Sequence, residues 1–366
     1  MSEPASSLPA PPRRRLARLA TAVAVLAFGL LVAYGLWWWQ AKAALDNLIS
    51  ELSSAGEPVT LASLVVGPVA EERNGYANIR AAIALLDPVD IELQSDKPIR
   101  VGVKLPLSES QRLQLRELTR DGPMILAALA PARGKPQCVN DRLQLQSPAV
   151  SIALPELAPL RRLANLARRM AVLEMDAGRH EQALQNLRLI EPLAQGAASH
   201  LFLIGALAAT GARSMAADGF MDFAPHLSIG ASPGQAPPEL VRACIADLLE
   251  ETVARDEFLR ALRAERVMQL DTLQSLLEGK LDQNELVAPE GTGKSLRTPP
   301  LISRPLLRSN VRFAAAQTGE LIELLNSPAA RDWPGIQAQL QPLEQATRST
   351  LSGWRYSMAK VLMPSL

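Results

Sequence analysis

The feature that most constrains this chain is a run of 23 residues without a charged side chain, residues 19–41, bounded by Arg18 and Lys42. At a rise of 1.5 Å per residue, such a run forms a helix about 34 Å long, which is enough to cross a hydrocarbon core of roughly 30 Å. A single segment can satisfy its own backbone polar groups in lipid only as a helix. The run therefore predicts one transmembrane helix near the N-terminus.

The residues that flank this run predict its orientation. The exit side carries acidic residues as well as Lys42, and the positive-inside rule therefore places residues 1–18 in the cytoplasm as a disordered basic tail and everything after Lys42 outside. Aromatic rings of the kind that settle at a membrane interface mark the exit end of the run. The anchor residues are Arg13, Arg14, Arg15 and Arg18 before the run, and Tyr34, Trp37, Trp38 and Trp39 at its end.

Two alternatives bear on this topology. Ala41-Lys42-Ala43 has the small-x-small form of a signal-peptide cleavage site, but the apolar core of a signal peptide is usually only about 7–15 residues long, so we expect a retained anchor. A second uncharged run, residues 192–212, contains Gln195, His200 and many small residues. We expect it to be a buried core helix, which leaves a single-pass protein.

The rest of the chain predicts a mostly α-helical fold with one small β-hairpin. Val89 to Leu105 alternates apolar and polar residues around a turn, which is typical of two paired strands. Helices are expected at 40–54, 73–86, 108–129, 157–177, 181–194, 198–223, 239–277, 306–325 and 333–362. Beyond the tail and the span, the predicted regions are 42–150 (helices plus the β-hairpin), 151–230 (αα-hairpins) and 231–366 (a long-helix region with a flexible linker at 279–305).

A weak internal repeat is visible in the αα-hairpin region. Gly178 and Ala183 lie five residues apart at a helix–helix turn, as in a tetratricopeptide unit, and a shift of 34 residues reaches Ala212 and Ala217. Two such units are fewer than the three that a free-standing solenoid needs. An ordinary αα-hairpin with small residues at its crossing remains the alternative.

Composition argues against several classes of function. Lys and Arg total 38 against 37 Asp and Glu, without the basic excess of a nucleic-acid binder, and only two cysteines argue against Cys-based zinc sites. The three histidines lack metal-site spacing, and there is no Gly-x-Ser-x-Gly elbow, so we predict no metal and no catalytic residue. Whether Cys138 and Cys244 form a disulfide is left open.

Two further patterns were weighed as binding sites. Gly293, Lys294 and Ser295 end a loose phosphate-loop pattern, but no strand precedes it and Pro299-Pro300 follows it, so we expect a linker that binds neither nucleotide nor another cofactor. In the long helix, Arg255 and Arg266 lie on the apolar seam near Glu265. These three could line a polar groove, although a solvated face with ion pairs is the alternative.

Several short motifs occur together in a characteristic order. They are Gly56-Glu57-Pro58-Val59-Thr60, Glu72-Arg73-Asn74-Gly75-Tyr76-Ala77, residues 157–164, the turn-helix at 178–187, Glu265-Arg266, and residues 304–310. In this ordering the chain resembles a diffuse group of bacterial single-pass membrane proteins, proteobacterial and planctomycete, that have helical extracytoplasmic domains and no assigned activity. Many of them carry a C-terminal Gly-x-Tyr-Pro-type segment that this sequence lacks. The resemblance implies an inner-membrane protein with a periplasmic body, and it transfers no catalytic residue.

These patterns lead to two functional hypotheses. The first is a non-enzymatic scaffold or adaptor that binds protein partners in the bacterial envelope, because an anchor and helical hairpins are present without a convergent catalytic set. The second is an envelope enzyme or ligand-binding module with a polar cleft along the helix at 239–277.

Overall fold

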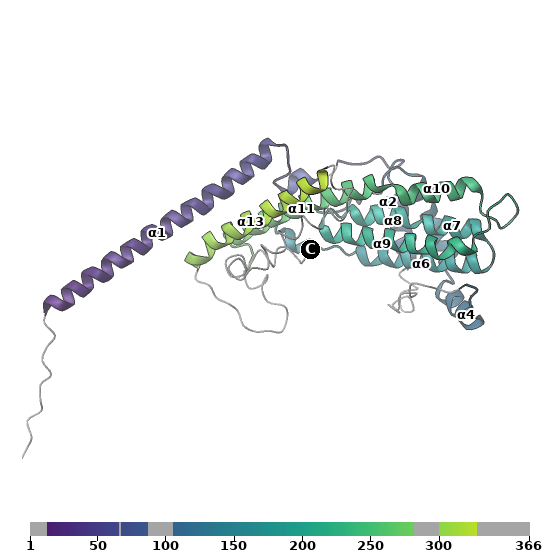
Figure 1. Cartoon of the computed structure of the whole chain (residues 1–366), viewed down its shortest axis with the longest axis horizontal. Coiled ribbons are helices and arrows are strands. Elements are labelled where there is room, and N and C mark those ends of the chain that lie inside the picture. Colours follow the sequence, from purple (N-terminus) through teal and green to yellow (C-terminus); the bar gives the residue numbers. More distant parts are fainter. Residues whose placement is uncertain (1–12, 66, 87–104, 282–299, 328–366) are drawn as a thin grey trace, which may run out of the picture. The chain divides into compact units, whose positions relative to one another are not determined.

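The computed structural model describes residues 13–65, 67–86, 105–281 and 300–327 (Figure 1). These residues are mostly α-helical, as the sequence predicts. They contain no strand and only two isolated bridges, Asn74 with Gln137 and Ile229 with Ala236. The expected β-hairpin falls almost wholly in 87–104, outside the described residues.

The chain divides into two compact units. The first consists of Met1–Gly56, Asp282–Ala316 and Gln341–Leu366, and the second of Glu57–Leu281 and Gln317–Leu340. These bounds differ from the regions expected from sequence, because the first unit combines the N-terminal helix with segments from the C-terminal part of the chain.

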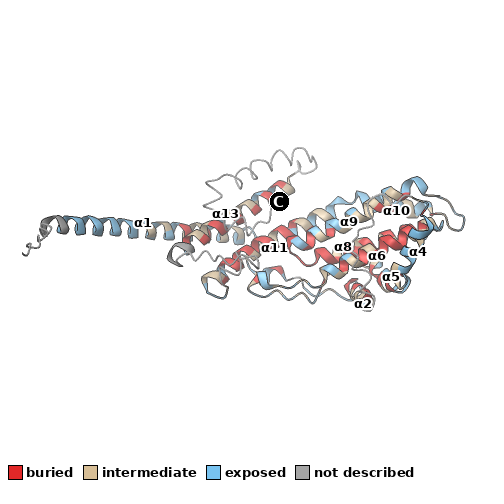
Figure 2. Ribbon diagram, turned by 90° about the horizontal axis from the view of Figure 1, so that it is seen from below, coloured by how far each residue is buried: buried red, intermediate tan, exposed pale blue. Residues whose placement is uncertain are grey.

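In the first unit, α1 (Arg13–Ser54) is a single unbroken helix that contains the whole predicted span and continues beyond it, as expected. Its apolar stretch has a mean hydropathy of 2.3, and none of that stretch is buried by protein. Side chains such as Phe28 and Leu31 are 69% exposed, which suits contact with lipid (Figure 2). Among the described residues this is the one helix long and apolar enough to cross a membrane, consistent with a single-pass anchor.

The helix α13 (Pro300–Asn326) starts in the first unit and begins six residues earlier than expected. A proline at the first position of a helix costs little, because the first N–H groups have no partner within the helix. The expected linker at 279–305 therefore extended too far. The last expected helix, 333–362, lies outside the described residues.

The second unit is built from helical hairpins. Gly178, at φ +73°, makes the turn between α6 (Leu157–Asp176) and α7 (His180–Arg188), and α8 (Ile190–Ala198) packs beside α9 (Leu203–Phe223) (Figure 1). Their shared core includes Leu163, Leu187 and Ile190, all fully buried. The αα-hairpin arrangement is thus present, and the tetratricopeptide relationship stays a prediction.

Shorter elements cover this core. The helices α2 (Tyr76–Leu86) and α5 (Gly122–Leu129) pack on each other and on α6, and α4 (Glu109–Leu118), which lies between them in sequence, also packs on α6. Thr60 and Ser108 each make a capping box at the start of η1 and α4. The expected helix 108–129 is two helices, because Pro123 has no N–H to continue the helix and its ring would clash with the preceding turn, whereas a proline is tolerated in the first turn of α5. The short 3-10 turns are η1 (Leu61–Leu64), η3 (Ala130–Gly134), η4 (Ala149–Ser151) and η5 (Ala224–His226).

The long helix expected at 239–277 is also broken. It consists of α10 (Pro238–Leu249), which packs on α7, and α11 (Glu251–Leu277), which packs on α9. Glu250 sits at the break with ψ 91°, and its carboxylate accepts the backbone N–H of Thr252 at 3.0 Å. A side chain that caps the next helix in this way stabilises the non-helical backbone at its own position.

Candidate functional site

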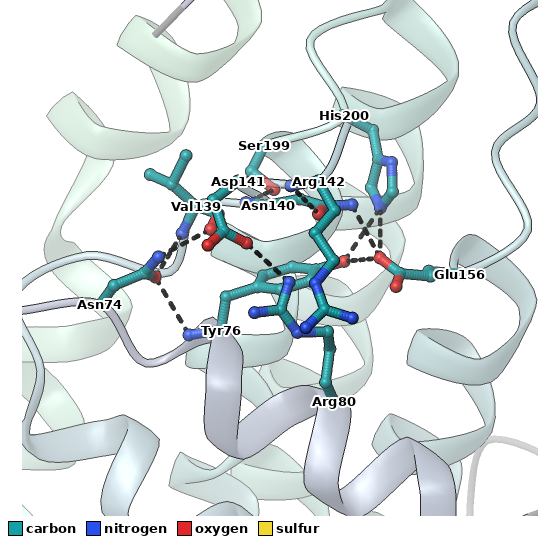
Figure 3. A network of polar contacts seen from close by, with 10 residues as sticks. All are labelled: Asn74, Tyr76, Arg80, Val139, Asn140, Asp141, Arg142, Glu156, Ser199 and His200. Carbon is teal, nitrogen blue, oxygen red and sulfur yellow. Dashed lines mark hydrogen bonds and ion pairs between the residues drawn. The ribbon is translucent and has the colours of Figure 1, made fainter. Parts of the chain in front are cut away.

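The largest set of connected polar side chains among the described residues lies where the start of α2 meets the α8–α9 junction (Figure 3). It begins at Asn74, which is buried. Its Nδ2 donates to the Val139 carbonyl and its Oδ1 accepts the Val139 N–H, both at 2.9 Å, and the same Oδ1 accepts the Tyr76 N–H at 3.1 Å. One amide side chain therefore holds the loop at 137–139 against the first residue of α2.

Tyr76 extends this network into the core. Its hydroxyl lies 2.5 Å from Glu156 Oε2 and 3.2 Å from His200 Nε2. Asn140 Nδ2 donates to the same Glu156 oxygen at 2.7 Å, and the Asn140 N–H donates to Ser199 Oγ at 3.0 Å. Residues separated by up to 124 positions in the sequence thus meet at one carboxylate.

The electrostatics of this cluster fix its protonation. Burial, and next the hydrogen bond to Glu156, raise the pKa of Tyr76, so the phenol stays neutral and donates its proton to the carboxylate. Burial lowers the pKa of His200, which stays neutral as well. Because His200 Nδ1 has no partner, we place the ring proton on Nε2, facing the Tyr76 oxygen.

The outer side of the network is closed by an ion pair. Arg80 Nη1 lies 2.6 Å from Asp141 Oδ1, and the guanidinium carbon is 5.5 Å from the centre of the Tyr76 ring. The hydrogen bond from Arg80 lowers the pKa of Asp141. Tyr76 and His200 are 0% and 1% exposed, so a solute cannot reach them in this conformation. The arrangement is suited to holding four chain segments together.

The three residues of the predicted groove do not converge on one site. Arg266 is 2% exposed, and its Nη2 bonds Glu57 at 2.7 Å; Arg263 Nε bonds the same Glu57 carboxylate at 3.0 Å. Glu265 is buried and accepts the backbone N–H of Leu203, and burial raises its pKa to about 7. Arg255 is half-buried with no ion pair to a described residue. The acid that pairs with Arg266 is thus Glu57, 209 positions away, and not a neighbour in the helix.

A second charged cluster ties three helices together. Arg213 of α9 makes a two-pronged contact with Glu191 of α8, at 2.8 and 3.0 Å, and reaches Glu257 of α11 at 2.7 Å. Burial disfavours the cation, but the two carboxylates outweigh it and raise the pKa of Arg213. Sequence reasoning missed this cluster, because no local spacing connects its members.

A hollow of about 420 Å³ lies beside α4 and the C-terminal end of α6. Its acids are already engaged: Asp176 accepts from Arg112 Nε at 2.7 Å and from the Leu107 N–H at 2.8 Å, and Glu174 pairs with another of the arginines. Arg116 and Arg120 have no acidic partner in the described part of the chain. The charged lining residues are Arg112, Arg116, Arg120, Arg179, Glu174 and Asp176.

No family model, no curated protein and no solved structure matches this chain. The resemblance to bacterial single-pass membrane proteins therefore rests on the sequence motifs alone. One of these motifs contains Asn74 and Tyr76, which both belong to the buried network, although the motif by itself did not predict that network.

The remaining sequence candidates have separate outcomes. Cys138 and Cys244 are free thiols: Cys138 packs against Gly75 at the start of α2, and Cys244 faces Leu184 of α7, so the disulfide does not form. No group of three potential metal ligands occurs among the residues that the structure describes. The phosphate-loop-like Gly293, Lys294 and Ser295 fall in 282–299, outside those residues.

Proposed function

We propose that this chain is a single-pass protein of the bacterial inner membrane, with a cytoplasmic N-terminus and a periplasmic helical body that serves as a non-enzymatic scaffold for envelope proteins. The bounding arginines and the exposed apolar length of α1 support the topology. The inward-facing polar clusters support the scaffold role, because their side chains bond to one another and hold helices together, and they do not face a solute.

One observation carries the scaffold proposal: a row of exposed apolar side chains on α10 and the start of α11. Leu249 is 75% exposed and Ile245 51%. The spacing of three and four residues places Ile245, Leu248 and Leu249 on one face of α10, and Val253 is exposed at the start of α11, beyond the break at Glu250. Large apolar side chains gathered on a surface mark sites of protein contact. The proposed occupant is the apolar face of a helix from a partner protein.

Site-specific photocrosslinking tests this function. A photoreactive residue is placed at Leu249 and, as a matched control, at Leu113, an exposed leucine on α4. We expect one reproducible adduct with the same envelope protein from Leu249 only, and its loss when Ile245→Lys and Leu248→Lys are added without a change in melting temperature. Equal labelling from both positions, or an adduct insensitive to the lysines, refutes the docking row.

The topology is tested separately with reporter fusions. Alkaline phosphatase, which folds only in an oxidising compartment, is joined after Leu281 or placed before Ser2. Activity only in the first fusion supports a periplasmic body. An immunoblot that detects a soluble form roughly 4 kDa lighter would instead show a cleaved signal peptide.

The arginine-lined hollow favours a second candidate function, a binding module for small anions. Arg116 and Arg120 supply cationic donors without an acid in place. Citrate and inorganic phosphate are suitable probes in a thermal-shift titration. Saturable stabilisation that disappears in Arg116→Gln/Arg120→Gln would favour this function; a response identical in both proteins would exclude it.

A further inference from the structure

A second set of arginines lies on α13 in the unit that contains the membrane helix. Arg304, Arg308 and Arg312 are spaced by four residues, so they form one row along the helix, which we call the α13 arginine row. In sequence, no Asp or Glu occurs between Glu290 and Glu320. None of the three arginines makes an ion pair with a described residue, and Arg308 Nη1 has no hydrogen-bond partner.

Arg308 fixes the position of this row relative to α1. Its guanidinium carbon lies 5.0 Å from the centre of the Trp38 ring, within cation–π range. Trp38 is the middle of three tryptophans at the end of the apolar run, and such rings sit at the level of the lipid headgroups. At 1.5 Å per residue, Arg304 and Arg312 lie about 6 Å along α13 on either side of Arg308. The whole row therefore falls within about one helical turn of the headgroup level.

The surroundings of the row leave it open to an external acceptor. Leu307 and Val311, on the adjacent strip of α13, are buried, so the helix is held to the protein by its apolar residues (Figure 2). Arg304 and Arg312 are exposed. A guanidinium can donate two parallel hydrogen bonds to a phosphate, and a basic segment beside a membrane helix attracts anionic headgroups.

We propose that the α13 arginine row binds the phosphate groups of anionic phospholipids in the leaflet that holds the Trp37–Trp39 belt. The proposal rests on the membrane-anchor part of the proposed function and is independent of the scaffold part. Arg308 stacks on the belt, and Arg304 and Arg312 hold headgroups on either side of it. Lipid phosphates thus supply the acceptors that the described residues do not supply for these cations.

Quenching of tryptophan fluorescence by brominated lipids tests this inference in the full-length protein, because the belt tryptophans adjoin the row. The protein is reconstituted in vesicles that contain brominated phosphatidylglycerol with plain phosphatidylcholine, or the reverse pair. The ratio of quenching gives the preference for the anionic lipid at the belt. An arginine near an anionic surface contributes about a fivefold preference. We therefore expect Arg304→Gln/Arg312→Gln to lower the preference by up to about 25-fold, and high salt to lower it in the wild type.

The controls separate the possible failures. Arg161→Gln/Arg260→Gln removes two exposed arginines of the second unit and should leave the preference unchanged. Arg308 is kept in both variants, so the environment of Trp38 is preserved. No quenching by either lipid would refute the membrane anchor itself. Three results would overturn the lipid proposal alone. The first is quenching without a preference for the anionic lipid, and the second is the same preference in Arg304→Gln/Arg312→Gln as in the wild type. The third is a preference that soluble phosphate abolishes at matched ionic strength.

Discussion

The side chain of Asn74 should be among the most important single groups for the stability of the helical body. It is 5% exposed and makes three hydrogen bonds to backbone groups, two to Val139 and one to Tyr76. In Asn74→Ala, all three backbone groups lose their partner at a place that water reaches poorly. At about 1 kcal/mol for each bond, the substitution should lower the free energy of unfolding by about 3 kcal/mol.

This loss translates into a measurable change in melting temperature. For a body of this size, 1 kcal/mol corresponds to about 2–4 °C, so Asn74→Ala should melt about 6–12 °C below the wild type. The assay is thermal unfolding of the full-length chain in detergent micelles, followed by far-ultraviolet circular dichroism. Asn78→Ala is the matched control, because Asn78 lies in the first turn of α2, four residues after Asn74, and makes no side-chain hydrogen bond among the described residues. Alanine is the better helix former, so this control should melt at or slightly above the wild type.

The comparison of the two variants can refute the reasoning. If Asn74→Ala melts within about 2 °C of Asn78→Ala, the three hydrogen bonds of Asn74 do not stabilise the folded protein by the amount that their burial implies. The loop at 137–139 would then be held by the backbone hydrogen bonds of Gln137 to Arg73 and Gly75, together with apolar contacts. If both variants lose the same large amount, the effect belongs to α2 in general and not to Asn74.

Three further predictions concern buried groups. The pKa of Glu265 is about 7 in the folded protein against 4.5 for an ordinary glutamate, so the folded state holds this proton more tightly. The stabilisation from protonated Glu265 is present below pH 4.5 and is lost as the pH rises through 7, by up to about 3 kcal/mol. The melting temperatures of the wild type and Glu265→Gln should therefore diverge across this pH range. A Cβ at Gly75 would lie 2.8 Å from Cys138 Sγ, so Gly75→Ala should lower the free energy of unfolding in denaturant by about 1–3 kcal/mol. Gly211 of α9 has no atom within 4 Å of the position of an added Cβ, so Gly211→Ala should raise that free energy by up to about 1 kcal/mol. Burial raises the pKa of Cys138 to about 12 and of Cys244 to about 11, so maleimide should label both thiols slowly in the folded protein and rapidly in urea; fast labelling of the native protein would contradict their burial.

The features that could be predicted from sequence are those set by nearby residues. The length of α1 follows from one uncharged run, and the capping box at Ser108 and the turn at Gly178 each depend on a few adjacent positions. The break at Glu250 was missed, because neither glycine nor proline marks it. A glutamate that caps a helix through its own side chain falls outside the usual Ser, Thr, Asp and Asn signal.

The buried network could not be predicted, because its partners are distant in sequence. Tyr76 is 80 residues from Glu156 and 124 from His200, and no periodicity connects them. The motif around Asn74 was visible, but nothing local names Val139 as its partner. Similarly, the seam position of Arg266 suggested a buried cation, and only the folded chain shows that Glu57 is the acid beside it.

The arginines of the two units differ in a way that bears on the membrane proposal. In the second unit, buried or half-buried arginines are matched by acids supplied from distant positions: Arg168 by Asp222, Arg213 by Glu191 and Glu257, and Arg266 by Glu57. Arg169 and Arg255 have no such acid among the described residues, and burial lowers the pKa of Arg169. Around α13, the sequence provides no acid across 291–319, although it places the three arginines of the row there. Arg304 and Arg312 are exposed, so their guanidinium groups are open to an anion from outside the protein. No described residue forms an ion pair with the α13 arginine row, and under the lipid proposal its anions are headgroup phosphates, which the stacking of Arg308 on Trp38 brings within reach.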